Sequence, residues 1–247
     1  MYQRALTGYQ KALDPVWTPM ELTSICSSIL EHRYKNRRQY NAYCPGASWG
    51  PNDKKAQDHR DIGHHFHNLL TGGRLYLAPI TDDVQKVLDI GTGTGIWAIP
   101  TPSATVISTD LSPIQPSWVP PNVQFMIDDC TDEWLYKKGL FHYIHIRGMY
   151  GSVGHWDMLY EKAYNYIEHW EQSVQAKSDN GTTVGTVYEE WTELALCAGD
   201  AFGKTLRSVD ETKGRITKAG FVDAVEKRFK CPLGPWASDP TLKKMGS

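Results

Sequence analysis

The middle of the chain consists of short apolar runs, each of which ends at a glycine or a charged residue. Four runs are rich in Val, Ile and other apolar residues, as buried strands of a sheet are. They cover residues 86–90, 104–109, 123–127 and 141–146. Because parallel strands bring their C-terminal ends to one edge, the glycine and charged residues after the runs are expected to meet there. The pattern predicts an α/β fold.

Helical patterns flank these strands. Residues 1–45 are predicted to be helical, and Thr18 with Pro19 has the composition of a helix start. Apolar residues at helical spacing predict two further helices, over residues 55–70 and 156–167. The sheet is therefore expected to have helices before it and within it.

The length of 247 residues allows one large α/β unit with added segments. We predict a helical lead-in over residues 1–80 and a Rossmann-like domain over residues 81–247. The 26 basic and 28 acidic residues give a net charge of −2, which argues against a nucleic-acid substrate. Five cysteines without a C-x-x-C pair indicate reduced thiols, and we expect neither a secretory signal nor a membrane span.

The most specific motif is the run DIGTGTG over residues 89–95, directly after the first predicted strand. Its glycines let the backbone approach a ligand closely. A dinucleotide fingerprint would have Gly or Ala where this chain has Ile96. Asp89 would repel a pyrophosphate but attract the sulfonium and ammonium groups of S-adenosylmethionine. The motif therefore favours S-adenosylmethionine over NAD, and a glycine turn without a ligand is the alternative.

Acidic residues also end the next two predicted strands. Asp110 lies 110 − 89 = 21 residues after Asp89, where an acid can accept both ribose hydroxyls. Asp128 or Asp129 can accept the exocyclic amine of adenine. Each alone could instead be a helix N-cap or a solvated turn residue. The predicted cofactor-binding residues are Asp89, Gly91, Thr92, Gly93, Gly95, Asp110, Leu111, Asp128, Asp129 and Arg147.

Several stretches closely resemble the fungal LaeA-like methyltransferases, and the run DLSPIQP over residues 110–116 is particularly specific. The resemblance extends from about residue 29 to the end of the chain. The stretches that carry it are 36–43, 51–53, 60–65, 87–99, 109–123, 128–134 and 143–149. It implies a class I S-adenosylmethionine fold that binds S-adenosylmethionine or S-adenosylhomocysteine, a fungal origin, and roles in secondary metabolism and development.

The resemblance also implies protein partners, either velvet-type regulators or another methyltransferase-like subunit, and a location in the cytoplasm and nucleus. Two functions remain open. The first is a methyltransferase that acts on a small molecule or a protein side chain. The second is a regulatory subunit that keeps the cofactor fold and works through a heteromeric complex. The complete set of strand-end acids indicates retained cofactor binding, whereas the lack of an evident base favours the second function.

The sequence departs from the family at two connections. After Ile99 a proline-rich stretch follows at once and leaves room for about one helical turn. After Ile167 the chain continues directly to Glu168, where the family has a glycine-rich turn. The chain also reaches Ser247 before the expected terminal strands. We hypothesise that both short connections reflect missing segments and not native deletions.

Other polar and aromatic residues have two interpretations each. Asp61, His64, His65 and His67 could form a metal cluster, but adjacent histidines on a helix point about 100° apart. A helix packed under the cofactor is therefore the favoured interpretation, and no metal is predicted. Tyr40 and Tyr43 could cover the cofactor or belong to the core. These last two alternatives are weighted equally.

The catalytic base is not identified by the sequence. Arg147 could face the methionine carboxylate or the substrate, or it could form a structural ion pair. A base is needed only if the acceptor holds its proton tightly. The candidates from position alone are His145, His155, His169 and Glu171.

Overall fold

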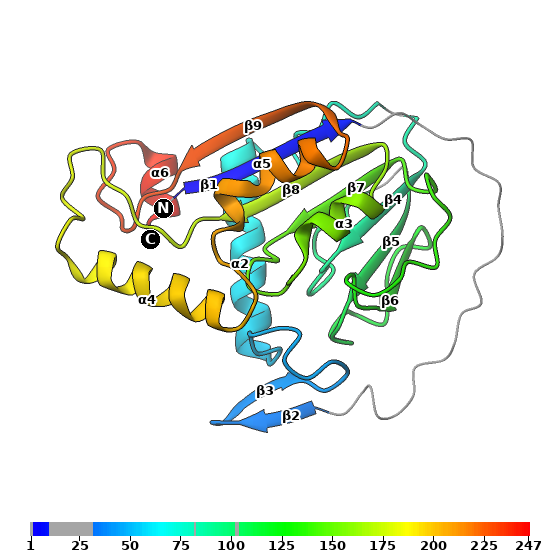
Figure 1. Cartoon of the computed structure of the whole chain (residues 1–247), viewed down its shortest axis with the longest axis horizontal. Helices are drawn as coiled ribbons and strands as arrows, with labels where there is room; N and C mark the ends of the chain where they lie inside the picture. Colours follow the sequence, from blue (N-terminus) through cyan, green and yellow to red (C-terminus); the bar gives the residue numbers. More distant parts are fainter. Residues whose placement is uncertain (1, 10–31, 82, 102–103) are drawn as a thin grey trace.

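Figure 1 shows the computed structural model, which describes residues 2–9, 32–81, 83–101 and 104–247. A seven-stranded sheet forms its centre, and a two-stranded sheet lies apart from it. The helix start predicted at Thr18 lies outside the described residues. The strands of the large sheet, in spatial order, are β6 (Val123–Ile127), β5 (Thr105–Asp110), β4 (Lys86–Ile90), β7 (Tyr143–Arg147), β8 (Tyr166–Gln172), β1 (Tyr2–Tyr9) and β9 (Val222–Lys230).

The first five of these strands are parallel, which confirms the predicted α/β sheet. Val87 of β4 pairs with Val106 of β5 on one side and with Tyr143 of β7 on the other. The chain therefore builds outward from β4 in both directions. Such a reversal of strand order opens a crevice at the C-terminal ends of the strands, where ligands bind in this type of sheet.

Strands β1 and β9 extend the sheet in the antiparallel sense. β1 pairs with β8 on one side and with β9 on the other. The helical prediction is therefore wrong for residues 2–9, because pairing with strands more than 150 residues away satisfies both backbone edges of this segment. β1 and β9 also supply the outer strands that the sequence was expected to lack.

A hairpin replaces the predicted helix between residues 32 and 41. It consists of β2 (His32–Lys35) and β3 (Arg38–Asn41), which pair in register. Asn36 and Arg37 form its turn with φ of 51° and 60°. Two left-handed residues in succession are the geometry of a tight hairpin turn. The helical prediction is wrong here because this local turn competes with a helix.

The helix predicted over residues 55–70 is confirmed as α2 (Lys54–Thr71). The Asp53 side chain caps it by accepting from Ala56 N at 3.0 Å, and Gly72 ends it with φ of 65°. Arg38 donates to the Asp53 carboxylate from Nε at 2.5 Å and holds the pKa of that carboxyl well below its usual range. The hairpin is thereby fixed to the start of α2. The predicted domain boundary at residue 80 stays a prediction.

Helix α3 (Trp156–Lys162) is shorter than predicted. Asn165, with φ of 63°, redirects the chain into β8. Ile167 and Glu168 therefore lie inside a strand that pairs with β7 and β1. The hypothesis of a missing segment between these two residues is wrong, because the helix ends earlier and the turn precedes them.

The connection after the glycine run is one tight turn, as predicted. The backbone N–H groups of Ala98 and Ile99 both donate to the carbonyl of Gly95, at 3.1 and 3.2 Å. The Trp97 indole is buried and donates to the carbonyl of Leu75 at 2.8 Å. Because residues 102 and 103 lie outside the described residues, a missing segment at this connection stays a prediction.

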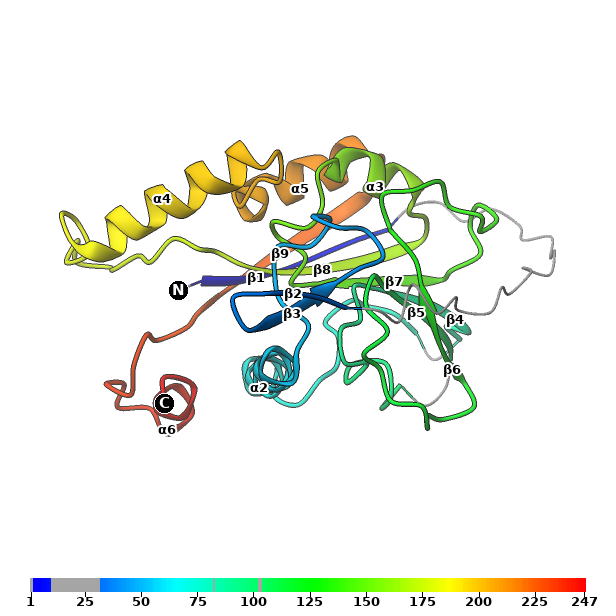
Figure 2. The ribbon, with the colours of Figure 1, turned by 90° about the horizontal axis from the view of Figure 1, so that it is seen from below.

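Helices lie on both sides of the large sheet (Figure 2). α3, α4 (Val187–Ala201) and α5 (Ser208–Lys218) lie on one side, and α2 and α6 (Pro240–Met245) lie on the other. Successive side chains of a strand point to opposite faces of the sheet, so each face has its own core. Val87 packs with Trp97 on one face, and Leu88 joins the cluster around Trp156 on the other. Among the described residues, no helix is both long and apolar enough to span a membrane.

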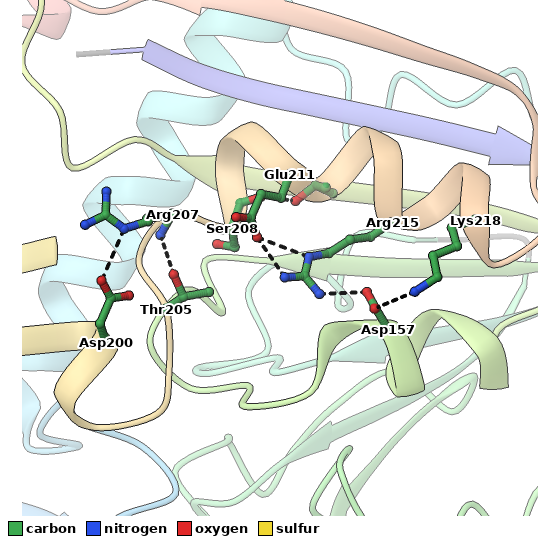
Figure 3. A network of polar contacts seen from close by, with 9 residues as sticks. Asp157, Asp200, Thr205, Arg207, Ser208, Glu211, Arg215 and Lys218 are labelled. Carbon is green, nitrogen blue, oxygen red and sulfur yellow. Dashed lines mark hydrogen bonds and ion pairs between the residues drawn. The ribbon is translucent and has the colours of Figure 1, made fainter. Parts of the chain in front are cut away.

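Ion pairs on the surface orient α5 against α3 (Figure 3). Arg215 of α5 contacts Asp157 of α3 at 2.7 Å and Glu211 of its own helix at 2.7 Å, and Lys218 also reaches Asp157, at 3.3 Å. These side chains are partly exposed, and exposed pairs contribute little stability each. The buried residues Val209 and Ile216 are therefore the main attachment of α5.

The loop that precedes β4 is anchored by a buried carboxylate. Glu168 of β8 is fully buried. It accepts hydrogen bonds from Leu77 N at 2.8 Å, from Ala78 N, and from the Trp170 indole at 2.5 Å. Burial raises the pKa of Glu168, and the three donors oppose that rise. One side chain thus satisfies three N–H groups that the fold removes from water.

We expect Glu168→Ala to lower the free energy of unfolding by about 2–4 kcal/mol, because it leaves buried donors without an acceptor. Urea titration followed by circular dichroism measures this change. The control is Glu161→Ala, which removes an exposed carboxylate from the same region and should stay within about 0.5 kcal/mol of the parent protein. Equal effects of the two variants would contradict the anchoring role.

Helix α2 packs on β8 through a neutral histidine. The His67 ring lies edge-on to Trp170, with 5.5 Å between ring centroids, and its Nδ1 donates to the carbonyl of Gly63 at 2.7 Å. Burial lowers the pKa of His67 to about 3. An unfolded histidine titrates near 6.5. Acid therefore protonates His67 in the unfolded chain first and favours unfolding.

Between about pH 7 and about pH 5, His67 should remove about 1–2 kcal/mol of stability. His67→Gln should lessen the pH dependence of the urea midpoint by that amount, whatever its effect at neutral pH. His65→Gln is the matched control because His65 is exposed on the same helix. An unchanged pH dependence in His67→Gln would show that His67 is not held neutral by the fold.

Candidate active site

The glycine run forms a bend that only glycine tolerates. Gly91 and Gly95 adopt φ of 71° and 81°. A Cβ at Gly91 would overlap the side chain of Met149, and a Cβ at Gly95 would overlap the ring of Phe125. The bend therefore needs glycine both for its left-handed backbone and for close packing.

Four backbone donors of this bend are already used inside the protein. Gly91 N and Thr92 N donate to the carbonyl of Thr109 at 2.9 and 3.0 Å, and Gly95 N donates to the carbonyl of Thr92 at 3.1 Å. Gly93 N donates to the Asp110 carboxylate at 2.8 Å. A pyrophosphate is bound mainly by free backbone N–H groups of such a loop. The bend thus does not suit a dinucleotide.

A cavity of about 550 Å³ lies beside the bend, at the C-terminal ends of β4, β5, β6 and β7. The segment from Ser48 to His67, which includes most of α2, forms the wall opposite the strands. Eight of the ten predicted cofactor-binding residues line it: Gly91, Thr92, Gly93, Asp110, Leu111, Asp128, Asp129 and Arg147. Gly95 and Asp89 are the two that do not.

Asp110 ends β5 and faces the cavity while half-buried. Its two carboxylate oxygens accept from Gly93 N at 2.8 Å and from Ser112 N at 2.9 Å. Burial raises the pKa of Asp110, and these donors together with Arg60 oppose the rise. Each oxygen keeps a second lone pair for a ligand hydroxyl. The geometry is compatible with the predicted contact to ribose.

The acids after β6 differ from one another. Asp129 Oδ1 accepts from the backbone N and the hydroxyl of Thr131 at 2.9 and 2.7 Å, which is the turn role left open by the sequence. Asp128 is half-buried, and burial raises its pKa. Burial also raises the pKa of the neighbouring Cys130 to about 12, so its thiol stays protonated. Asp128 is therefore the stronger candidate for a contact to adenine.

Asp89 lies beneath the bend and not in the cavity wall. It is buried, and its Oδ1 pairs with His145 Nδ1 at 2.7 Å. The His145 ring stacks on Trp97 with 3.7 Å between centroids and an angle of 3°. Burial lowers the pKa of His145. Asp89 is therefore not positioned to contact a ligand in the cavity directly. That its negative charge attracts the cofactor stays a prediction.

Arg147 ends β7 and projects into the cavity wall. Its Nη1 donates to Nδ1 of His64 at 3.1 Å, and the other ring nitrogen of His64, Nε2, lies 3.0 Å from the Asn68 side-chain nitrogen. Burial and the charge of Arg147 lower the pKa of His64 to about 4. In the part of the chain that the structure describes, no ion pair joins Arg147 to a carboxylate. The structural ion pair considered from the sequence is thus not formed there.

The four base candidates all lie outside the cavity lining. His155 is exposed, while His145 and His169 are buried. Glu171 is also buried, and its Oε1 accepts from Met149 N at 2.6 Å and from Tyr150 N at 3.1 Å. Its role is to shape the turn after β7. The base therefore stays unidentified.

The structure also places the residues that the sequence offered as a metal cluster or as a cover for the cofactor. The described residues contain no group of three or more His, Cys, Asp or Glu side chains that could hold a metal. Asp61 instead accepts from the Thr94 hydroxyl at 2.6 Å, and His65 is exposed. Tyr40 and Tyr43 are both absent from the cavity lining, although burial and, more weakly, the charge of Asp128 raise the pKa of Tyr43.

Sequence reasoning missed many residues of the cavity wall, and three of them lie close to the glycine bend or to Ser112. Arg60 lies against Gly93, Met149 covers Gly91, and buried Asn52 donates to the Ser112 hydroxyl at 3.1 Å. Asn52 and Arg60 fall within stretches that resemble the LaeA-like family, which was the available signal. They were not assigned because their distance in sequence from the glycine run hides their proximity to it.

The chain is similar in sequence to known proteins. A family model described as "Methyltransferase domain" matches residues 62–221. Methyltransferase pytC of Aspergillus terreus is 36% identical over 93% of this chain and 74% of its own length. Secondary metabolism regulator LAE1 of Cochliobolus heterostrophus is 30% identical over 86% of this chain and 74% of its own length.

Among solved structures, an O-methyltransferase family protein from Burkholderia thailandensis matches with a TM-score of 0.43 and 13% identity, over 68% of this chain and 55% of that one. The strand order, the glycine bend and the sequence matches lead to one assignment. The chain belongs to the methyltransferase-domain family and is a LaeA-like, S-adenosylmethionine-dependent methyltransferase.

Proposed function

We propose that this chain binds S-adenosylmethionine in the cavity beside the glycine bend and transfers its methyl group to an acceptor in fungal secondary metabolism. The observation that carries the proposal is that carboxylates and guanidinium groups line the same cavity. Asp110, Asp128 and Asp129 line it, and so do Arg60 and Arg147. A nucleoside with an amino-acid tail has groups that match both kinds of side chain.

The residues present fit this cofactor. Asp110 keeps free lone pairs for ribose hydroxyls, and Asp128 is placed to accept from the adenine amine. The Arg60 guanidinium, beside Gly93, can hold the carboxylate oxygens of the amino-acid tail. When bound, S-adenosylmethionine supplies an electrophilic methyl group. The chain's contribution is to hold acceptor and methyl group in line, which is catalysis by proximity.

Asp110→Ala should weaken binding of S-adenosylhomocysteine by about 1–3 kcal/mol, because two ribose hydroxyls lose their acceptor. Isothermal titration calorimetry measures this difference directly. Asp210→Ala, which changes an exposed acid in the first turn of α5, is the control. Unchanged affinity in Asp110→Ala would remove the ribose assignment, and no binding by the parent protein would refute the proposed function.

A regulatory role in a complex is the second candidate. Several relatives are named secondary metabolism regulators, and α4 presents an apolar face to solvent. Val187, Trp191 and Leu194 share that face and are 69%, 51% and 71% exposed. An exposed stripe of this kind is typical of a protein interface. On this reading the chain acts in the cytoplasm and nucleus with a velvet-type regulator or another methyltransferase-like subunit.

If this second role holds, Trp191→Glu with Leu194→Glu should abolish co-elution with a velvet-type regulator in size-exclusion chromatography, because two charges would be buried at the interface. Affinity for S-adenosylhomocysteine should be unchanged. Glu193→Gln, on another face of α4, is the control. Co-elution that survives the double substitution would exclude α4 as the interface.

A further inference from the structure

Two guanidinium groups in the cavity wall have no carboxylate within ion-pair distance among the described residues. Arg60 donates from Nη2 to the carbonyl of Pro51 at 3.0 Å, and its Nη1 is buried without a partner. Arg147 donates to the neutral ring of His64. Removing a guanidinium from water without an anionic partner is costly. Both groups are therefore positioned to receive anionic oxygens from bound molecules.

The cofactor accounts for one of these sites, because it carries a single carboxylate. Arg60 lies on the cofactor's side of the cavity. A Cβ at Gly93 would be 3.3 Å from Arg60 Cδ, and the charge of Arg60 counters the raised pKa of Asp110. Arg147 lies instead at the end of β7, next to the turn that carries Met149 and Tyr150. Arg147 is thus left for a second anion.

Most of the glycine bend is not available to bind that anion. The N–H groups of four of its five residues, namely Gly91, Thr92, Gly93 and Gly95, donate to acceptors inside the protein. A charged side chain is therefore the stronger candidate to hold an anionic group on the acceptor. A guanidinium suits a carboxylate in particular, because its planar fork matches the two oxygens.

The histidines buried in the cavity wall are poorly suited to remove a proton from an acceptor. The four base candidates do not line the cavity, and two of its three lining histidines, His64 and His67, are weak bases with pKa values of about 4 and about 3, while His59 is exposed. The pKa of an effective base lies near the working pH. An acceptor that is already ionised at neutral pH needs no base.

We propose that Arg147 binds the carboxylate of the methyl acceptor, and that the acceptor is a carboxylic acid with an apolar body that is released as its methyl ester. This inference rests on the proposed methyltransferase function. A carboxylate oxygen bonds to the methyl carbon as the methyl–sulfur bond breaks. The electron pair of that bond stays on sulfur, no proton moves, and the opposite charges of sulfonium and carboxylate cancel.

The wall beside Arg147 fits such a body. Trp49 and Tyr150 both line the cavity, with 6.2 Å between their ring centroids, and the Trp49 indole donates to the carbonyl of Tyr150 at 3.2 Å. The Trp49 ring can present an apolar face because its N–H is held by the Tyr150 carbonyl. Arg147 can hold one carboxylate oxygen and leave the other free to attack.

Calorimetry on protein saturated with S-adenosylhomocysteine tests the site with three probes, namely benzoate, trans-cinnamate and hexanoate, each beside its neutral amide. At least one carboxylate should bind roughly tenfold more tightly than its amide, since only the carboxylate forms charge-assisted hydrogen bonds. Arg147→Gln should abolish this preference, and Arg147→Lys should retain part of it. If the amides bind as well as all three carboxylates, the proposal is overturned.

Cofactor affinity separates the two arginines. Arg147→Gln should change the dissociation constant of S-adenosylhomocysteine by less than about threefold, whereas Arg60→Gln should raise it by about tenfold or more. Arg60→Gln should leave binding of 5′-methylthioadenosine, which has no carboxylate, unchanged. A loss of S-adenosylhomocysteine affinity in Arg147→Gln as large as that in Arg60→Gln would assign Arg147 to the cofactor and overturn the proposal. Failure of the parent protein to bind S-adenosylhomocysteine would instead refute the proposed function.

Discussion

The whole cavity depends on the left-handed backbone at the glycine bend. Because Gly91 and Gly95 have no side chains, Met149 and Phe125 can occupy the space where Cβ atoms would lie. That packing brings the end of β7 and the side of β6 against the end of β4. A side chain at either glycine would separate these strand ends, and the acids and guanidinium groups that line the cavity would lose their spacing.

Buried acids support this arrangement from outside the cavity. Glu168 holds the loop before β4, and Glu171 holds the turn after β7 through two backbone N–H groups. Asp89 pairs with His145 beneath the bend. Each of these carboxylates is almost fully buried and has at least one oxygen paired inside the protein, while Asp110 and Asp128 are partly exposed and line the cavity. Exposure therefore separates acids that fix the backbone from acids that can meet a ligand.

Patterns of neighbouring residues predicted those elements that depend mainly on neighbouring residues. The β-branched runs gave β4 to β7, and the acids at strand ends gave Asp110 and Asp128, because a parallel sheet gathers such ends. β1 was missed because its partners are distant in sequence, and Arg60 was missed because helix α2 reaches the bend only in the folded chain. Asp89 was placed in the cavity because sequence spacing does not show which face of a strand a side chain occupies.

The short turn after the bend explains why arginines are prominent in this cavity. A long helix at this position would direct its N-terminal N–H groups and dipole at an anionic ligand. Here the chain makes about one turn between Gly95 and Ile99, and four N–H groups of the bend are engaged with Thr109, Thr92 and Asp110. Recognition of negative charge then depends largely on side chains. Arg60 and Arg147, contributed by α2 and β7, are two guanidinium groups of the cavity wall that have no carboxylate within ion-pair distance among the described residues.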